Sequence, residues 1–230
     1  MMELIEKSAY FGFLLSIACY FFGVWIKERT GWKFANPLLI AIIAVIAILS
    51  LGKVEYAHFN RGASYISYFL TPATICLAIP LYKQLSLLKK HLAAVLCAIG
   101  SGVAASLICV FAMSKLFGFD HQLYISMLPK SITTAIGMPV SEEMGGYAAL
   151  TAAAIIVTGI LGNIISEAVF RLFHIDEPIA RGLGLGTSAH AIGTSKALEL
   201  GEVEGAMSSL SIGVAGIMTV ILMPLFASLL

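Results

Sequence analysis

The sequence has few charged residues. They make up 12% of its 230 residues, whereas 59% of the residues are hydrophobic. A soluble domain carries about 25% charged residues, so this chain lacks the charge that covers a soluble surface. Its net charge of +1 and the absence of a basic tract argue against nucleic acid as a partner. The composition therefore predicts an integral membrane protein that lies in a lipid bilayer.

Patterns for metal, redox and enzyme chemistry are also missing. The four cysteines lie apart in apolar runs without a CxxC pair, which favours small buried side chains, and the five histidines are too dispersed for a metal site. The G-x-G-x-x-A match at 184–189 follows no predicted strand. Ser188 and His190 lack a visible third group and oxyanion site. We therefore expect no metal, no cofactor and no enzymatic activity.

Long apolar runs are abundant, and a transmembrane helix needs about 20 such residues. Five runs qualify: 8–26, 35–51, 91–114, 147–170 and 205–229. The first run is too long for the apolar core of a signal peptide, and no small-residue cleavage site follows it. A sixth run, 63–82, contains Pro72 at its middle. This proline predicts either a broken helix that lines a cavity or a simple kink.

Two more polar stretches, 122–144 and 182–201, lie between these runs. Both contain A-I-G, five variable residues, Glu, an apolar residue and Gly, starting at Ala135 and at Ala191. Ser and Thr precede each match, and a long apolar run follows it. The match predicts a short internal repeat, and the alternative is a chance similarity between segments of small residues.

Basic residues indicate how these two stretches enter the membrane. If both are re-entrant hairpins, the larger basic set falls on one side: Lys27, Arg29, Lys33, Lys83, Lys89, Lys90, Arg171 and Arg181. The smaller set falls on the other side: Lys7, Lys53, Arg61 and Lys115. If 122–144 spanned the membrane instead, this bias would vanish. We therefore predict two re-entrant hairpins in units of opposite orientation, 122–170 and 178–229, with both termini outside.

The predicted hairpins carry groups that bind anions. Non-helical backbone at membrane depth is buried in protein or lines water, and its free N–H groups and helix N-termini attract negative charge. Glycines allow close approach of the backbone to a ligand: Gly137, Gly184, Gly186 and Gly193. The predicted ligand is small, polar and anionic. Its predicted binding residues are Lys130, Ser131, Thr133, Thr134, Thr187, Ser188, His190, Thr194, Ser195 and Lys196, with Thr71 and Pro72 at the broken helix.

Several of these side chains have a simpler alternative. Lys130 and Lys196 either contact the ligand or extend from the hairpin base to the membrane interface. His190 either donates to the anion or carries a coupling proton, and otherwise it is a satisfied buried residue.

Acidic and amide side chains are further candidates for ion coupling. Glu143, Glu199 and Asn163 join His190 in this set, although both glutamates also fit an interfacial position. Glu167 is one turn from Arg171, so we expect an ion pair within that helix.

Four segments carry a family resemblance. They are "NPLLIAI" at 36–42, "TPATICLAIPLYKQ" at 71–84, "LPKSITTAIGMPVSEEMGG" at 128–146 and "RGLGLGTSAHAIGTSKALELGEVEGAMSSL" at 181–210. With these segments the chain resembles the LrgB/CidB family of bacterial membrane proteins over nearly its whole length. Family members usually have proline at the place of Ala135, whereas this chain has Pro139. Glu142 and Glu143 are also atypical of the family segment.

The resemblance implies two functions. One is a holin- or antiholin-like protein that acts with a small LrgA/CidA-type membrane partner and is linked to murein hydrolase activity and autolysis. The other is transport of pyruvate, or of glycolate and glycerate as in a plant plastid relative. Polar hairpins and a broken helix favour a carrier of short monocarboxylates. A holin-like pore and an accessory subunit remain the alternatives.

Together these observations predict an all-α integral protein of the bacterial cytoplasmic (inner) membrane. It has about six transmembrane helices and two re-entrant hairpins in an inverted repeat, with one helix broken at Pro72. Within a single membrane domain, 1–230, the expected parts are scaffold-like helices in 1–62, the broken helix and next span in 63–121, and the two hairpin units. The plain helices in 1–62 suit a homo-dimer.

Overall fold

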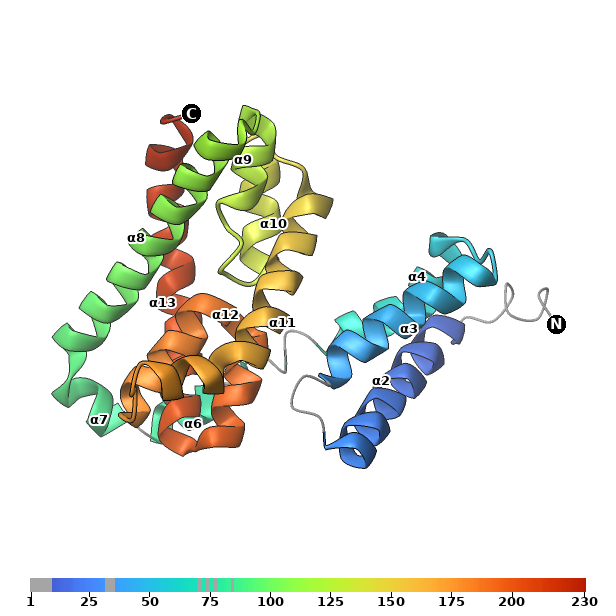
Figure 1. The fold of residues 1–230 in the computed structure, drawn as a ribbon, viewed down its shortest axis with the longest axis horizontal. Helices are drawn as coiled ribbons and strands as arrows, with labels where there is room; N and C mark the ends of the chain where they lie inside the picture. The colour runs from blue at the N-terminus through green and yellow to red at the C-terminus, as the bar shows by residue number, and fades with distance from the viewer. Residues whose placement is uncertain (1–9, 32–35, 70–71, 73–74, 77, 84) are drawn as a thin grey trace. The chain divides into compact units, whose positions relative to one another are not determined.

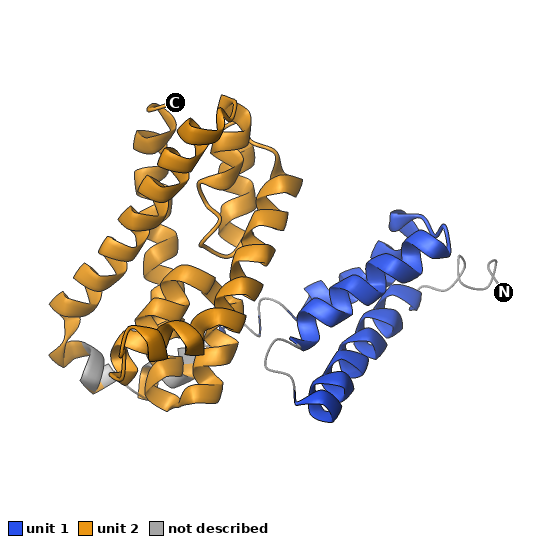
Figure 2. Cartoon of the chain, in the orientation of Figure 1, with its two compact units in different colours: residues 1–76 blue, residues 77–230 orange. Residues whose placement is uncertain are grey.

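The computed structural model describes residues 10–31, 36–69, 72, 75–76, 78–83 and 85–230. Every regular element in these residues is an α-helix, in agreement with the predicted all-α class. The chain forms two compact units, Met1–Cys76 and Leu77–Leu230 (Figure 2). The domain boundaries that we expected near 62, 121 and 170 stay predictions.

The first unit contains α2 (Phe11–Thr30), α3 (Pro37–Leu51) and α4 (Tyr56–Ser67) (Figure 1). The Asn36 side chain caps α3 by accepting hydrogen bonds from the backbone N–H groups of the second and third helical residues, at 2.9 and 3.2 Å. Pro37 occupies the first position, where a helix does not need a backbone N–H. Local sequence therefore sets the start of α3.

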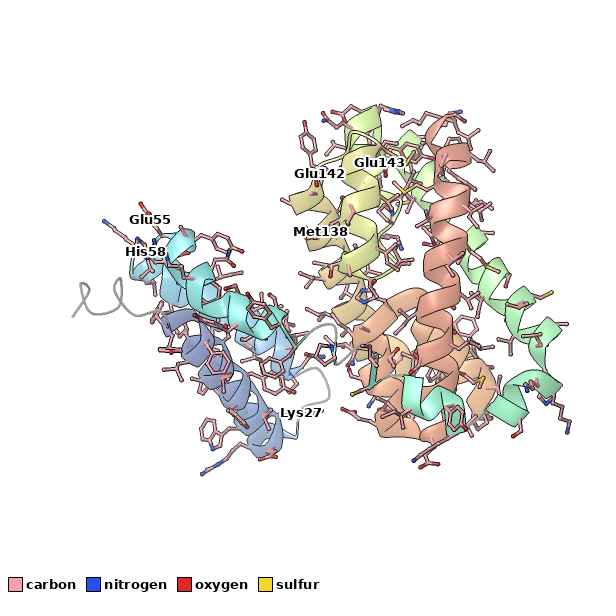
Figure 3. The ribbon with its side chains drawn as sticks, turned by 180° about the vertical axis from the view of Figure 1, so that it is seen from behind. Lys27, Glu55, His58, Met138, Glu142 and Glu143 are labelled. Carbon is pink, nitrogen blue, oxygen red and sulfur yellow. The ribbon has the colours of Figure 1, made fainter. Side chains whose placement is uncertain are left out.

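Glycines set the packing within the first unit. A Cβ atom at Gly12 of α2 would overlap the backbone oxygen of Phe59 in α4, and one at Gly23 would lie 2.5 Å from the backbone oxygen of Pro37 in α3. Small residues of this kind allow membrane helices to approach closely. Figure 3 shows Lys27 near one end of this unit and Glu55 and His58 near the other.

Four helices in the described residues are long and apolar enough to cross a membrane: Phe11–Thr30, Leu92–Phe117, Ala148–Leu172 and Glu202–Ala227. The run at 35–51 gives a shorter apolar helix of 15 residues, α3. In the run at 63–82, α4 ends at Ser67 and a six-residue helix, α6 (Ala78–Lys83), follows. The predicted total of six spans is therefore not confirmed.

In the described residues of the second unit, seven helices follow α6. They are α7 (Leu85–Lys90), α8 (Leu92–Phe117), α9 (His121–Met127), α10 (Thr134–Glu143), α11 (Ala148–Leu172), α12 (Pro178–Leu200) and α13 (Glu202–Ala227). One stripe of α8 is buried in the core of this unit: Val95, Ile99, Val103, Leu107 and Val110. Because these positions recur every three or four residues, they lie on one face of the helix, where they belong to the same core as Met207 and Met223 of α13.

The stretch at 122–144 forms a helical hairpin. Asp120 caps its first helix, α9, by accepting from the backbone N–H of Leu123 at 2.7 Å. Residues 128–133, here called the hairpin loop, then lead into α10. The side chains of Ser126, Ser141 and Thr151 join the hairpin to α11, since the last two hydroxyls are 2.7 Å apart and Thr151 Oγ1 donates to the Ser126 carbonyl at 2.9 Å.

The stretch at 182–201 also reverses direction. His190 has φ 42° and ψ −133°, which interrupts α12 between a first arm, 178–189, and a second arm, 191–200. A Cβ atom at Gly193 would lie 2.5 Å from the Leu185 carbonyl oxygen, whereas a straight helix separates residues eight apart by roughly 12 Å. The two arms therefore fold back on each other at His190.

The two hairpins occupy different ends of the second unit. The α9–α10 hairpin lies beside the C-terminal end of α8, and α12 lies at the end that carries α6 and α7 (Figure 1). This arrangement fits two hairpins that point toward the middle of the unit from opposite ends. Their insertion into a bilayer and their relation by an inverted repeat stay predictions.

Candidate functional site

A cavity of about 1120 Å³ lies in the second unit, between α8, α11 and the first arm of α12. Its polar wall includes Ser106 of α8, Lys130 and Ser131 of the hairpin loop, and Thr187 and Ser188 of α12. Four of these five residues are predicted ligand contacts, and they come from both polar stretches. The fold therefore brings part of the predicted site together.

Both hairpins reach the cavity on successive turns of α8. Ser131 Oγ lies 2.9 Å from Ser106 Oγ, and a Cβ atom at Gly102 would lie 2.8 Å from the methyl group of Thr187. Positions 102 and 106 are one turn apart, about 6 Å along the helix axis. A single bound group at this level of α8 therefore has polar side chains of both hairpins beside it.

Lys130 supplies positive charge to this wall. Its half-buried Nζ donates to Ser131 Oγ at 3.2 Å. None of the ion pairs found in the described residues includes Lys130. An ammonium group has three donors and is costly to bury without an anionic partner, so it favours a negatively charged ligand in the cavity.

Thr187 also lines the cavity, and its hydroxyl is buried. The residue is 7% exposed, and its Oγ1 has no hydrogen-bond partner. A buried hydroxyl without a partner costs about 1–3 kcal/mol, so this position is strained in polar terms. The neighbouring Ser188 differs, because its Oγ already donates to the Gly184 carbonyl at 2.7 Å.

Three other predicted residues serve the packing of the second hairpin. His190 Nε2 lies 2.9 Å from the Ile155 carbonyl oxygen of α11. Thr194 Oγ1 donates to the His190 carbonyl at 2.9 Å and lies 2.7 Å from Ser208 Oγ of α13. Asn163 donates to the Ile192 carbonyl at 3.0 Å. None of the three predicted residues is among those that line the cavity, so their roles toward a ligand or coupling ion stay predictions.

Lys196 forms a cluster with acids instead of lining the cavity. Its Nζ lies 2.7 Å from Glu167 Oε1 and 3.2 Å from Glu199 Oε2. Our expectation for Glu167, a pair with Arg171 within α11, missed this contact between elements. Arg171 Nε donates to the backbone carbonyl of Glu167 at 3.3 Å. The cluster joins the second arm of α12 to α11.

The remaining predicted residues lie at the margins of the hairpins. Thr133 precedes the first residue of α10, Thr134, and its carbonyl accepts from the N–H of Gly137 at 2.8 Å. Ser195 is exposed and donates to the Ile192 carbonyl at 2.7 Å. These residues are also outside the cavity wall.

A predicted coupling residue, Glu143, lies at the end of α10. Glu143 is the last residue of that helix, next to Glu142 (Figure 3), and its side chain is exposed. Pro72 is exposed, and Thr71 lies outside the described residues.

The predicted role of the glycines is largely wrong. Gly186 approaches the backbone of Ser208 in α13, Gly193 approaches Leu185, and Gly137 approaches Ile155 in α11. These three glycines permit contact between protein segments and leave no room for a ligand. Gly184 is the exception, because a Cβ atom there has nothing within 4 Å and the residue lines the cavity.

Sequence reasoning missed several cavity residues. They are Ser106 and Cys109 of α8, Thr158 and Ser166 of α11, and His91 and Glu177. Most lie within or beside long apolar runs, where single polar residues have no local signature. The spacing of Gly102 and Ser106, four apart, is a small-residue pattern that signals close helix contact. In the described part of the chain, no group of three or more His, Cys, Asp and Glu residues is placed to hold a metal ion.

Comparison with known proteins adds an independent result. The model of the LrgB-like family matches residues 16–229. Proteins called "Antiholin-like protein LrgB" from Bacillus cereus (strain B4264) and Bacillus anthracis (strain A0248) are 40% identical over 220 residues, which is 95% of this chain and 96% of each relative. No solved structure matches the chain significantly. The match and the four long apolar helices identify a multi-pass membrane protein.

Proposed function

The chain belongs to the LrgB-like family, and we propose that it is an antiholin-like membrane protein whose molecular activity is to carry a small organic anion across the bilayer. The antiholin-like role has the more direct support, because relatives that are 40% identical carry that name. The carrier activity, our main hypothesis from the sequence, rests on the cavity. The two are compatible if the cellular effect follows from anion traffic.

The observation that carries the transport proposal is the unpaired Lys130 in the wall of a cavity that both hairpins reach. A carboxylate near Nζ would replace the missing counter-ion, and the neighbouring hydroxyl of Ser131 would supply a second hydrogen bond. Short monocarboxylates of the pyruvate, glycolate or glycerate class are the first substrates to test. A small LrgA/CidA-type membrane protein is the proposed partner.

The proposed transport mechanism is alternating access. Six spans and two re-entrant hairpins related by an inverted repeat would place the anion near the middle of the bilayer. Movement of the hairpins against α8 would open the site first to one side and then to the other. A homo-dimer in the bacterial cytoplasmic membrane, with the first unit as scaffold, completes the proposal.

Uptake of radiolabelled pyruvate and glycolate into proteoliposomes, with and without the partner, tests this function. The expected result is saturable uptake that Lys130→Met abolishes. Lys115→Met is the matched control, because Lys115 is on α8 but contacts the Phe111 ring outside the cavity. Protein yield and size-exclusion profile of each variant establish that the chain is folded.

A holin-like pore or an accessory subunit is the second candidate, and the name of the relatives favours it. A pore predicts leak of uncharged solutes that does not saturate and that survives Lys130→Met. An accessory subunit predicts no flux by this chain alone and a changed leak when the partner is present. Either result would contradict the carrier proposal.

A further inference from the structure

The walls of the cavity divide into a polar end and a longer apolar part. The polar end is formed by Ser106, Lys130, Ser131 and Thr187, near the middle of α8. The second part extends toward the N-terminal end of α8 and the C-terminal end of α11, and most of its residues are apolar: Val95, Ala98, Ile165, Val169, Phe170 and Leu183. His91, Ser166 and Glu177 are the polar residues in this part. A ligand that fills this cavity must therefore have two chemically different ends.

The size of the cavity argues against a two- or three-carbon acid as its best ligand. Sites for drug-sized molecules are about 300–1,000 Å³, and this cavity is about 1120 Å³. A short acid bound at Lys130 would leave most of the apolar wall without contact. Burial of an apolar substituent against that wall would add binding energy in proportion to its area.

We infer that the cavity binds single-chain amphipathic carboxylates, with the carboxylate at Lys130 and Ser131 and the hydrocarbon chain along the apolar wall. The inference rests on the proposed function and specifies its substrate class. Charge decides the orientation, because Lys130 is the only lysine or arginine among the cavity residues of the described chain. Glu177 lies at the other end of the wall, beside the start of α12, where it disfavours a second carboxylate.

The chain contains a reporter for this site. Cys109 lines the cavity one turn from Ser106, and the residue is exposed. The other cysteines, Cys19, Cys76 and Cys97, do not line the cavity and can be replaced by alanine. The rate at which N-ethylmaleimide labels Cys109 then measures occupancy in the full chain, reconstituted in lipid nanodiscs.

The experiment compares acetate, hexanoate and decanoate as protectants of Cys109. The expected half-protecting concentration falls about fourfold for each methylene that is buried. Decyltrimethylammonium, with the same chain length and opposite charge, should not protect. Lys130→Met should remove protection by decanoate, and Lys115→Met should leave it unchanged. Ala98→Phe, at an exposed position of the apolar wall, should weaken the protection of Cys109 by decanoate and leave the protection by acetate unchanged.

Other outcomes overturn the inference in distinguishable ways. Equal protection by acetate and decanoate rejects the amphipathic ligand but retains an anion site. Protection by decyltrimethylammonium indicates partition into the nanodisc. Slow labelling without added acid, unaffected by decanoate, indicates that a bilayer phospholipid or a protein segment fills the cavity. Failure of the proposed function would appear separately, as absent uptake of every acid in proteoliposomes.

Discussion

The α9–α10 hairpin reverses direction through the six-residue loop 128–133, whereas α12 reverses at the single residue His190. In both, the A-I-G segment opens the second arm, since Ala135 is the second residue of α10 and Ala191 follows His190. The same short motif thus follows two different turns.

The longer turn places side chains in the cavity wall, and the shorter turn does not. Lys130 and Ser131 lie in the loop and reach the cavity. His190 is 4% exposed, with its ring against Gly159 and the Ile155 carbonyl. The second hairpin therefore contributes to the cavity through its first arm, at Thr187, and the turn itself serves packing.

Replacement of Gly193 and Gly137, the matched glycines of the two A-I-G segments, should give the largest difference in the free energy of unfolding between the hairpins. A Cβ atom at Gly193 would meet the backbone of Leu185, which cannot move independently, whereas one at Gly137 would first meet the flexible end of Ile155. We expect Gly193→Ala to lower the free energy of unfolding by about 3 kcal/mol and Gly137→Ala by about 1 kcal/mol. Thermal unfolding in detergent measures both.

Gly184→Ala provides the control for this pair, since the position is helical and open. It should be neutral or stabilising, because alanine favours helix over glycine by up to about 1 kcal/mol. Equal losses at positions 193 and 137 would contradict the proposed difference between the hairpins.

Substitution at the turns should give the next largest effect. His190→Ala loses the bond to the Ile155 carbonyl, a cost of about 2 kcal/mol, and retains a side chain at positive φ. His190→Gly loses the same bond but relieves the backbone, so it should be the more stable of the two. At Thr133, where φ is −70°, the alanine variant should be more stable than the glycine variant. The same order at both positions would refute this account.

Substitutions of Lys196 and Lys130 should separate effects on stability from effects on ligand binding. Lys196→Met breaks a partly exposed ion pair with Glu167 and should cost about 0.5–1 kcal/mol, without changing protection of Cys109 by carboxylates. Lys130→Met should abolish protection and leave the unfolding temperature nearly unchanged. Loss of ligand protection in Lys196→Met would extend the binding site to the second arm.

The matched acids should give the smallest effects on stability. Glu143 and Glu199 are both exposed, and Glu199 makes the longer of the two contacts with Lys196, at 3.2 Å. Glu143→Gln and Glu199→Gln should each change the unfolding free energy by less than about 0.5 kcal/mol. Their predicted role in coupling is tested separately, by the pH dependence of uptake. A large stability loss in either variant would show that the exposed position is occupied by a partner.

Local sequence patterns determined the helical membrane class of this protein and the places where its chain turns back. Low charge and long apolar runs predicted a helical membrane protein, and the polar stretches at 122–144 and 182–201 predicted the places where the chain turns back. These features depend on neighbouring residues, because helix formation and burial in lipid follow from short-range composition. Identification of the family followed from the same stretches.

The tertiary structure alone decided which polar groups have hydrogen-bond partners within the protein. Thr187 and Thr194 have the same side chain seven residues apart, yet Thr194 bonds to His190 and Ser208 while Thr187 has no partner. Ser106 joined the site from within an apolar run. The segment that packs against a hydroxyl, an imidazole or a glycine determines what that residue contacts. Which segments pack together is decided only when the helices assemble, so the contacts cannot be read from the sequence.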